Sequence, residues 1–373
     1  MLKKIERLGG GRCTDGERFA RERARKLWFH PSTIIRPSVR PNLYLTNLCN
    51  RRCNYCYAQD WITQDEGNCQ HMSLDNLDKV IHWLKSSRIT TVQLIGGEPM
   101  LHPNILDVVK KLLKNSIVIH TVLTNGLGDN ELYKSIINID TKNEIKWLVN
   151  VDHPSTYTKE EWDLLIRNLE LLKWINADKL LGHNPLDTEA FQLHLAITLY
   201  EPDQDYAYII DLAKEYRVPF IRFAASQPSS DRHNRYVDFN GLIELKPTLM
   251  RFIRDCVREG IMMSLECLLP PCIFTGEEWR FLFLVTPNLR SICSPLIEIF
   301  PDLTVAYCFN MRKILPNYDL KRMSMKEIYR KNIEDSSKYR DNPMPRCKDC
   351  YYYIDRQCQG YCFRLRSDLL PND

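Results

Sequence analysis

Strand-like and helix-like segments alternate along this chain from residue 41 to about residue 260. Apolar residues recur at helical spacing over 74–87, 105–115, 160–175, 206–216 and 242–260. Six runs rich in Val, Ile, Leu and Tyr separate and flank them, at 42–47, 91–97, 117–126, 145–152, 191–200 and 220–226. Strands that alternate with helices form parallel βαβ units with right-handed crossovers. The sequence therefore predicts an α/β fold built on a partial or complete β/α barrel, with its functional site at the carboxyl ends of the strands.

Two of the helical segments carry more specific predictions. Ser73 directly precedes the segment 74–87 and is expected to be its N-cap, because a serine hydroxyl can accept from the free N–H groups of the first turn. Pro247 lies within the segment 242–260 and is expected to start or kink that helix, because proline has no backbone N–H.

The regular alternation stops near residue 262, which suggests three regions. Residues 1–40 form a basic N-terminal extension, residues 41–262 the barrel, and residues 263–373 a smaller region organised around cysteines and not a continuation of the barrel. This last region holds eight of the 14 cysteines, together with two strand candidates at 281–286 and 303–308.

The cysteine content also indicates a compartment. The N-terminus has no apolar segment typical of a signal peptide, and no stretch approaches the ~20 apolar residues that a membrane span needs. A chain of 373 residues with many cysteines and no secretory signal is expected in the cytoplasm, where thiols bind metals or do redox chemistry.

Residues 1–40 hold 11 Lys and Arg against four acidic residues, although the net charge of the whole chain is only +4. Residues 17–29 could form a basic helix that is solvated on the outside of the barrel, or one that contacts RNA or an acidic partner. The small net charge argues against nucleic acid as the main partner.

A run of three cysteines, Cys49-x3-Cys53-x2-Cys56, directly follows the first predicted strand. Three thiolates on one loop can bind three irons of a four-iron cluster and leave the fourth iron open. Zinc is the alternative, but a structural zinc site needs four ligands, and only Cys69 and His71 lie nearby.

The second strand ends in Gly96-Gly97-Glu98-Pro99. Two glycines permit a close backbone approach, and a carboxylate can accept from an ammonium group. With the cysteine run and this GGEP sequence, about half of the chain, residues 41–226, resembles the radical S-adenosylmethionine (SAM) superfamily. The resemblance implies a partial (β/α)6 barrel and a [4Fe-4S] cluster on the three cysteines. It also implies reductive cleavage of SAM to a 5′-deoxyadenosyl radical that abstracts hydrogen from a substrate.

The resemblance also implies residues that contact SAM or the substrate from the strand ends. GGEP would bind the methionine amine, and Thr124 and Asn125 end the third strand. Asn150 and Asp152 share a face of the fourth strand and could reach the ribose or the substrate, or serve only as hydrogen-bonding residues of the strand end. Weaker candidates are His194, Thr198, Arg222 and Ser226. The polar loop 226–236 is expected either to face the substrate or to be solvated.

The C-terminal cysteines form a second array, Cys347-x2-Cys350-x7-Cys358-x3-Cys362, preceded by Cys293-x14-Cys308 and Cys267-x4-Cys272. Taken alone, this array suggests a zinc ribbon. Beside the radical SAM motifs it resembles the SPASM/twitch extension, which binds auxiliary [4Fe-4S] clusters. That resemblance implies an inner cluster on Cys293, Cys308 and Cys362 with Cys272 (or Cys267), and an outer cluster on Cys347, Cys350 and Cys358.

This array departs from the SPASM pattern in three respects. The middle spacing is seven residues, Leu303 stands where the family usually has glycine, and no cysteine follows Cys362. The outer cluster therefore lacks its usual last thiolate. Its fourth ligand could be Asp368, Asp373 or another side chain, or the position could be open to substrate. One auxiliary cluster with a zinc site is the other reading.

The function that the resemblance implies is that of a radical SAM oxidoreductase or peptide-modifying enzyme, acting by cross-linking, epimerisation or oxidation. A reductant such as flavodoxin or ferredoxin would be a partner. Only about 40 residues precede the first strand, so a separate protein could deliver the peptide. One alternative is action on a small molecule such as a sugar or nucleoside. The other is a noncatalytic iron–sulfur or zinc protein that binds RNA, against which the cysteine run and GGEP argue together.

Overall fold

A computed structural model describes residues 40–142, 144–177 and 192–365. Its core is one sheet with the strand order β10-β9-β8-β1-β2-β3-β4-β5-β6-β7. The strands are β1 (Asn42–Tyr44), β2 (Thr91–Ile95), β3 (Val118–Thr124), β4 (Lys146–Asn150), β5 (Leu193–Leu199), β6 (Phe220–Ala225), β7 (Met262–Leu265), β8 (Glu298–Ile299), β9 (Thr304–Ala306) and β10 (Tyr318–Asp319).

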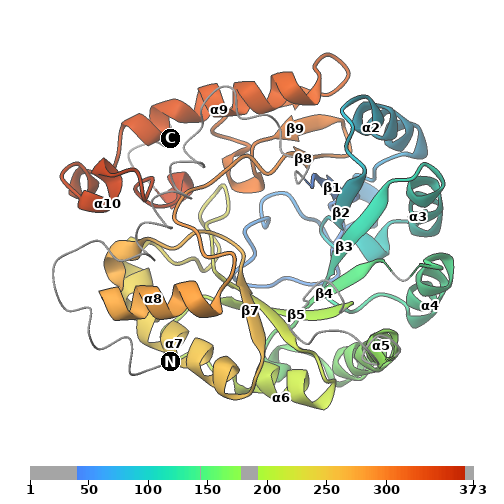
Figure 1. Ribbon diagram of the computed structural model, residues 1–373. Helices are drawn as coiled ribbons and strands as arrows, with labels where there is room; N and C mark the ends of the chain where they lie inside the picture. The colour runs from blue at the N-terminus through green and yellow to red at the C-terminus, as the bar shows by residue number, and fades with distance from the viewer. Residues whose placement is uncertain (1–39, 143, 178–191, 366–373) are drawn as a thin grey trace.

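Helices cover the outside of this curved sheet (Figure 1). They are α2 (Leu74–Ser86), α3 (Ile105–Lys114), α4 (Asn130–Ile139), α5 (Lys159–Ala177), α6 (Ala207–Glu215), α7 (Phe239–Arg258), α8 (Gly276–Val285), α9 (Met325–Asp341) and α10 (Tyr351–Ile354). Ser73 caps α2 as predicted, because its side chain accepts from the Asn76 N–H.

The six predicted strands are confirmed as β1 to β6, and each lies within its predicted run. They pair in chain order and in parallel, and β7 adds a seventh parallel strand beside β6. The α/β class and the partial barrel are therefore confirmed. The sequence analysis missed β7, a strand of only four residues, and α4.

The stretch after residue 262 is not separate from this sheet, contrary to the expectation that it does not continue the barrel. β8 pairs in parallel with β1, and β9 pairs antiparallel with both β8 and β10. The chain thus returns to the opposite edge of the sheet and extends it. The division at residue 262 stays a prediction about domain organisation.

Two local predictions in this part of the chain are wrong. The strand expected at 281–286 is the last part of α8, which begins with a capping box formed by Thr275 and Glu278. That box satisfies free N–H groups of the first turn and favours a helix over an extended run. Pro247 does not start its helix, because α7 begins eight residues earlier after the N-cap Asp238.

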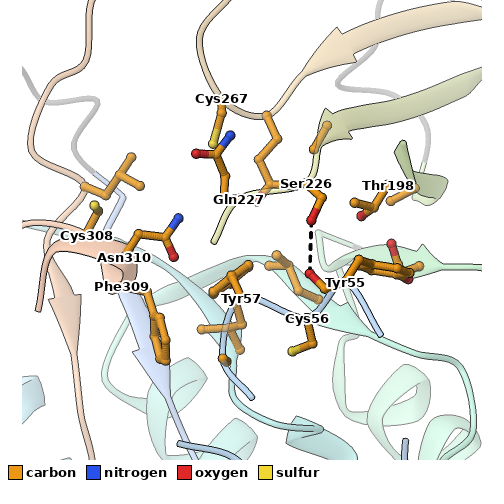
Figure 2. A pocket seen from close by; sticks show the side chains of 18 of the residues that line it. Tyr55, Cys56, Tyr57, Thr198, Ser226, Gln227, Cys267, Cys308, Phe309 and Asn310 are labelled. Atoms are coloured by element: carbon orange, nitrogen blue, oxygen red, sulfur yellow. Dashed lines mark hydrogen bonds between the residues drawn. The ribbon is translucent and has the colours of Figure 1, made fainter. Parts of the chain in front are cut away.

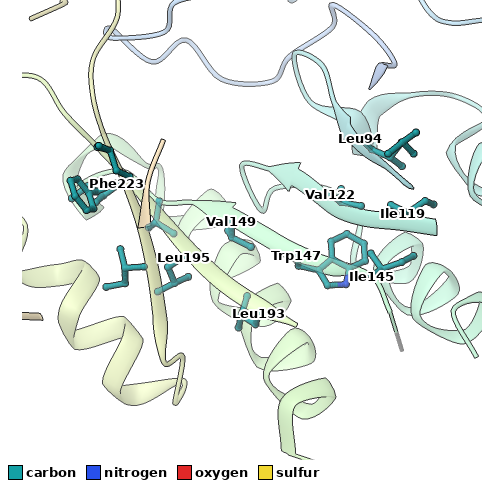
Figure 3. Packing of buried hydrophobic residues seen from close by; sticks show 14 of the residues in the cluster. Leu94, Ile119, Val122, Ile145, Trp147, Val149, Leu193, Leu195 and Phe223 are labelled. Atoms are coloured by element: carbon teal, nitrogen blue, oxygen red, sulfur yellow. The ribbon is translucent and has the colours of Figure 1, made fainter. Parts of the chain in front are cut away.

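Apolar side chains from the central strands form the main core under the helices. Figure 3 shows Leu94, Val122, Trp147, Leu195 and Phe223 among them, and each is at most 1% exposed. Buried runs on parallel strands are typical of sheets covered by helices. No helix among the described residues is long and apolar enough to cross a membrane. The basic helix expected at 17–29 lies outside the described residues.

Candidate functional site

A cavity of about 270 Å³ opens at the carboxyl ends of the parallel strands, and we call it the central cavity. Seven cysteines line it, from two distant parts of the chain: Cys49, Cys53, Cys56, Cys267, Cys293, Cys308 and Cys362. Figure 2 shows Cys56 beside Tyr55 and Tyr57 on one side, with Cys267 and Cys308 across the cavity. The site therefore lies where the strand pattern predicts it.

The three-cysteine loop, residues 49–56, carries thiols that are poorly suited to ionise unaided. Burial raises the pKa of Cys49 to about 12 and that of Cys56 to about 11. Burial also raises the pKa of Cys53, and the nearby Asp152 carboxylate adds to the effect. Thiolates here need a compensating positive charge, which the irons of a cluster supply. The donor set fits such a cluster.

Asn150 and Asp152 hold the three-cysteine loop from the end of β4. The Tyr55 hydroxyl bonds to the Asp152 carboxylate and accepts from the Asn150 side-chain amide at 2.8 Å. Asp152 also pairs with Arg51 at 3.2 Å and lies 3.3 Å from the Cys53 Sγ. Asn150 lines the central cavity and Asp152 does not. The Asp152 carboxylate is therefore already bound to the loop.

Part of the polar loop after β6, residues 226–236, packs against the three-cysteine loop, so the loop is neither wholly solvated nor wholly exposed to the cavity. Asn234 is buried, and its amide donates to the backbone oxygens of Tyr55 and Gln227, both at 2.9 Å. The Arg235 N–H donates to the Asn54 carbonyl at 2.7 Å. This loop thus also fixes the backbone of the three-cysteine loop. The sequence analysis did not predict that role.

Gly96 and Gly97 line the central cavity where β2 meets the three-cysteine loop. The Gly97 N–H donates to the Thr46 carbonyl at 2.7 Å. A Cβ atom on Gly97 would lie 2.3 Å from the Leu48 carbonyl oxygen, which is closer than real contacts allow. The glycines are therefore needed for the approach of the two backbones, and they leave backbone groups at the cavity wall.

Glu98 lies behind this wall and is fully buried. Its carboxylate accepts from the Met100 N–H at 3.0 Å, the Thr124 hydroxyl at 2.8 Å and the Asn125 N–H at 2.7 Å. Burial raises its pKa to about 7, although these hydrogen bonds favour the charged form. Glu98 joins the ends of β2 and β3, and neither Glu98 nor Pro99 lines the cavity.

Several other predicted residues do reach the central cavity. Arg222 lines it and pairs at 2.6 Å with Glu266, a lining residue that the sequence analysis missed. His194 does not line it, and its ring packs against Phe220 with the ring centroids 4.5 Å apart. Also on the wall are Thr124, Asn125, Thr198 and Ser226.

The four C-terminal cysteines of the central cavity form the inner group: Cys267, Cys293, Cys308 and Cys362. Burial raises the pKa of Cys267 and of Cys308, and charge on Cys293 and Cys362 would raise both further. The thiols are thus mutual neighbours. Cys267 follows β7 by two residues, which places it at the mouth of the barrel.

The other four C-terminal cysteines line a separate pocket, and we call them the outer group: Cys272, Cys347, Cys350 and Cys358. The structure thus places Cys272 with the outer group and its alternative, Cys267, with the inner group, and the cluster that each cysteine binds stays a prediction. A 3-10 helix at Pro271–Ile273 turns the chain away from the cavity after Cys267. Asp368 and Asp373, the other ligands considered, lie outside the described residues.

Among the described residues, no three His, Cys, Asp or Glu side chains converge on a point that would suit a single metal ion. A multi-iron cluster holds its thiolates around several metal atoms, and so does not require such convergence. The zinc interpretation of either cysteine array gains no support from this geometry.

Residues 43–173 match the family model described as the Radical SAM superfamily. This segment, about a third of the chain, is a radical SAM domain. The family implies a [4Fe-4S] cluster and SAM, and the cysteine-rich C-terminal region fits auxiliary clusters.

Similar curated proteins include GTP 3′,8-cyclases. That of Synechocystis sp. is 27% identical over 136 residues, which cover 34% of this chain and 39% of the cyclase. That of Clostridium perfringens is 34% identical over 110 residues, which cover 27% of this chain and 34% of the cyclase. The match thus spans well under half of these relatives, and their activity does not transfer with it.

The radical SAM chain also shares its fold with a solved structure over most of its length. Streptococcus suis SuiB bound to S-adenosylmethionine has a TM-score of 0.58 and 15% identity, with 97% of this chain and 82% of SuiB covered. SuiB bound to the precursor peptide SuiA gives a TM-score of 0.57 at 14% identity. This likeness extends the fold assignment to the C-terminal region.

Proposed function

We propose that this radical SAM enzyme modifies a peptide or protein substrate in the central cavity. The observation that carries the proposal is that the three-cysteine loop and the inner group line one cavity. A substrate there would lie between the SAM cluster and a second redox centre. Likeness in fold to SuiB, a protein solved with a precursor peptide, supports a peptide as the substrate class.

When bound, the cluster and SAM supply an electron and a 5′-deoxyadenosyl radical that abstracts hydrogen from the substrate. We assign the cluster to Cys49, Cys53 and Cys56. The backbone at Gly96 and Gly97 would bind the methionine part of SAM, since both glycines line the cavity at a strand end. Other lining residues proposed to contact SAM or substrate are Thr124, Asn125, Asn150 and Arg222.

Glu98, Pro99 and Asp152 act behind these residues. Glu98 keeps the β2 and β3 ends at a fixed distance, and Asp152 fixes Tyr55 and Arg51. Both carboxylates therefore position the lining residues and do not themselves contact the ligand. Of the loop thiols, Cys49 is buried and Cys53 and Cys56 are half-buried, which limits the access of water to the reacting groups.

A small molecule is the second candidate substrate. The similar GTP 3′,8-cyclases favour it, although they match only 34% and 27% of the chain. The ion pair of Arg222 with Glu266 and the side chain of Arg290 give the cavity charged groups that could bind a polar small molecule. A reductant such as flavodoxin or ferredoxin is a proposed partner, and a separate peptide-delivery protein is compatible with the proposal. We place the enzyme in the cytoplasm because its chemistry needs reduced thiols.

SAM cleavage is the first test. The anaerobically reconstituted chain is incubated with SAM and dithionite, and 5′-deoxyadenosine is quantified beside the Cys49→Ala/Cys53→Ala/Cys56→Ala variant. We expect the native chain to form the product and the triple variant to form none. Failure of the native chain to bind SAM would overturn the radical SAM assignment of these cysteines.

Substrate class is tested by adding host-cell extract, before and after exhaustive protease digestion, to the same reaction. Extract that accelerates 5′-deoxyadenosine formation only before digestion supports a peptide or protein substrate. Acceleration that survives both digestion and removal of peptides favours the small molecule instead.

A further inference from the structure

The outer group contains a fourth cysteine that the sequence pattern does not supply. The one later cysteine, Cys362, lies in the inner group, so spacing leaves Cys347, Cys350 and Cys358 without a fourth partner. In the structure Cys272, 75 residues before Cys347 in the chain, shares their pocket. Aromatic and proline residues make up much of the rest of that pocket, including Phe239, Pro270 and Tyr352.

Local backbone geometry holds these four thiols together. The 3-10 helix Pro271–Ile273 contains Cys272, and the two prolines before that cysteine, Pro270 and Pro271, restrict the backbone there. The Cys350 N–H donates to the Cys347 carbonyl at 3.2 Å, and the Cys358 N–H donates to the Tyr352 carbonyl at 2.9 Å. Gly360 has φ +79°, a conformation that suits glycine, and so the chain turns tightly after Cys358.

We propose that Cys272 is the fourth thiolate of an iron–sulfur cluster held by Cys347, Cys350 and Cys358. The proposal rests on the proposed function, since it takes the C-terminal region to bind auxiliary clusters. Four cysteines are the full ligand set of a [4Fe-4S] cluster. With Cys267 in the inner group, each C-terminal group then has four thiolates of its own.

Closed coordination has a functional consequence. An auxiliary cluster can bind substrate through an open iron or can accept an electron, and four thiolates leave no open iron. Neither auxiliary cluster would then bind substrate directly. The outer cluster also reaches the surface at one corner, because Cys272 is exposed while Cys347 and Cys358 are buried.

The test measures iron, sulfide and the electron paramagnetic resonance (EPR) spectrum in the Cys49→Ala/Cys53→Ala/Cys56→Ala background, so that only auxiliary clusters contribute. We expect this background to hold about eight irons per chain, the content of two [4Fe-4S] clusters. Adding Cys272→Ala should either remove one of these irons and give a [3Fe-4S] signal in the oxidised sample, or remove all four irons of the outer cluster. Iron content and spectrum equal to the background would overturn the proposal.

Control variants make the result specific. Cys69→Ala removes a half-buried thiol that belongs to neither group and should leave the iron content unchanged. Asp368→Asn/Asp373→Asn tests the rival ligands, and loss of iron there but not in Cys272→Ala would also overturn the proposal. An intact inner-cluster signal in Cys272→Ala shows that the variant has folded.

Alkylation of the native chain gives an independent readout. An exposed Cys272 thiol should react with iodoacetamide in the metal-free protein and be protected after reconstitution. Modification of Cys272 in the fully loaded chain would contradict ligation. A background variant that binds no iron at all would instead refute the auxiliary clusters of the proposed function, whatever the behaviour of Cys272.

Discussion

The three-cysteine loop and the outer group are both sets of thiols at a pocket, but they are assembled in opposite ways. The loop places its cysteines within eight residues and relies on the strand ends around it, through Asp152, Asn150 and Asn234, for its shape. The outer group takes Cys272 from a turn after β7 and its other members from residues 347–358.

This difference explains why spacing indicated all three cysteines of the loop but only three of the four in the outer group. Ligands that are close in sequence leave a motif, whereas ligands joined only by the fold leave none. It also separates the expected functions. The three-cysteine loop has three thiolates and can leave an iron open for SAM, while each C-terminal group has four.

The largest effect that we expect is on SAM cleavage, which should depend on the three-cysteine loop and not on the outer group. Cys347→Ala should still cleave SAM when no substrate is present, because the three-cysteine loop and its supports are untouched, while it loses iron from the outer group. The loop triple variant should form no 5′-deoxyadenosine and should keep its C-terminal iron. Parallel assays of product and iron would test this, and loss of SAM cleavage in Cys347→Ala would show that the two sites are not independent.

A second prediction concerns the support of the loop. Asp152→Asn should lower the free energy of unfolding of the metal-free chain by about 2 kcal/mol, because it removes the closer of the two carboxylates that pair with the buried Arg51 and leaves only Glu161, at 3.4 Å. Denaturant unfolding measures the change. The matched control is Asp203→Asn, which breaks the solvent-exposed pair with Arg251 and should cost less than about 1 kcal/mol. Equal losses in the two variants would contradict the supporting role of Asp152.

A third prediction tests the approach of β2 to the loop. Gly97→Ala places a methyl group 2.3 Å from the Leu48 carbonyl oxygen, so we expect about 2 kcal/mol of destabilisation and weaker SAM binding. Thermal unfolding and equilibrium binding of SAM report the two effects. Gly276→Ala, where the added carbon meets nothing within 4 Å, should leave SAM binding unchanged. Unaltered SAM binding in Gly97→Ala would show that the glycine is not needed there.

The barrel was predictable because its strands are buried on both faces and therefore form continuous apolar runs. The same criterion fails at residues 281–286, an apolar run of the same kind that is the end of α8. There the decisive signal was the capping box that Thr275 and Glu278 form just upstream. β7 escaped recognition since four residues are too few to establish a period.

The candidate site was predictable only where its residues follow a strand end. Cys49, Gly96 and Thr124 all do, and all line the central cavity. Sequence position did not distinguish lining residues from those behind them, and so Glu98 and Asp152 were expected to contact ligand. Membership of the two C-terminal groups depends on the turn at Pro271–Ile273, which no spacing encodes.

The smallest effect that we predict is a pH dependence of stability caused by Glu98, which supports the cavity wall without lining it. Burial gives Glu98 a pKa of about 7 in the folded chain, against an ordinary value of 4.5. Between these values the folded chain binds more protons than the unfolded chain, so its stability falls as pH rises. For this one carboxyl we expect a loss of about 1 kcal/mol between about pH 6 and pH 7.5.

Glu98→Gln has no proton to release, and the difference between native chain and variant isolates this contribution from Glu298, whose pKa is also raised to about 7 by burial. Urea unfolding of the metal-free proteins at several pH values gives both curves. We expect the native curve to fall more steeply than that of Glu98→Gln. Parallel curves would mean that Glu98 is already ionised in the fold, held by the hydrogen bonds from Met100, Thr124 and Asn125. Its burial would then carry no pH-dependent cost.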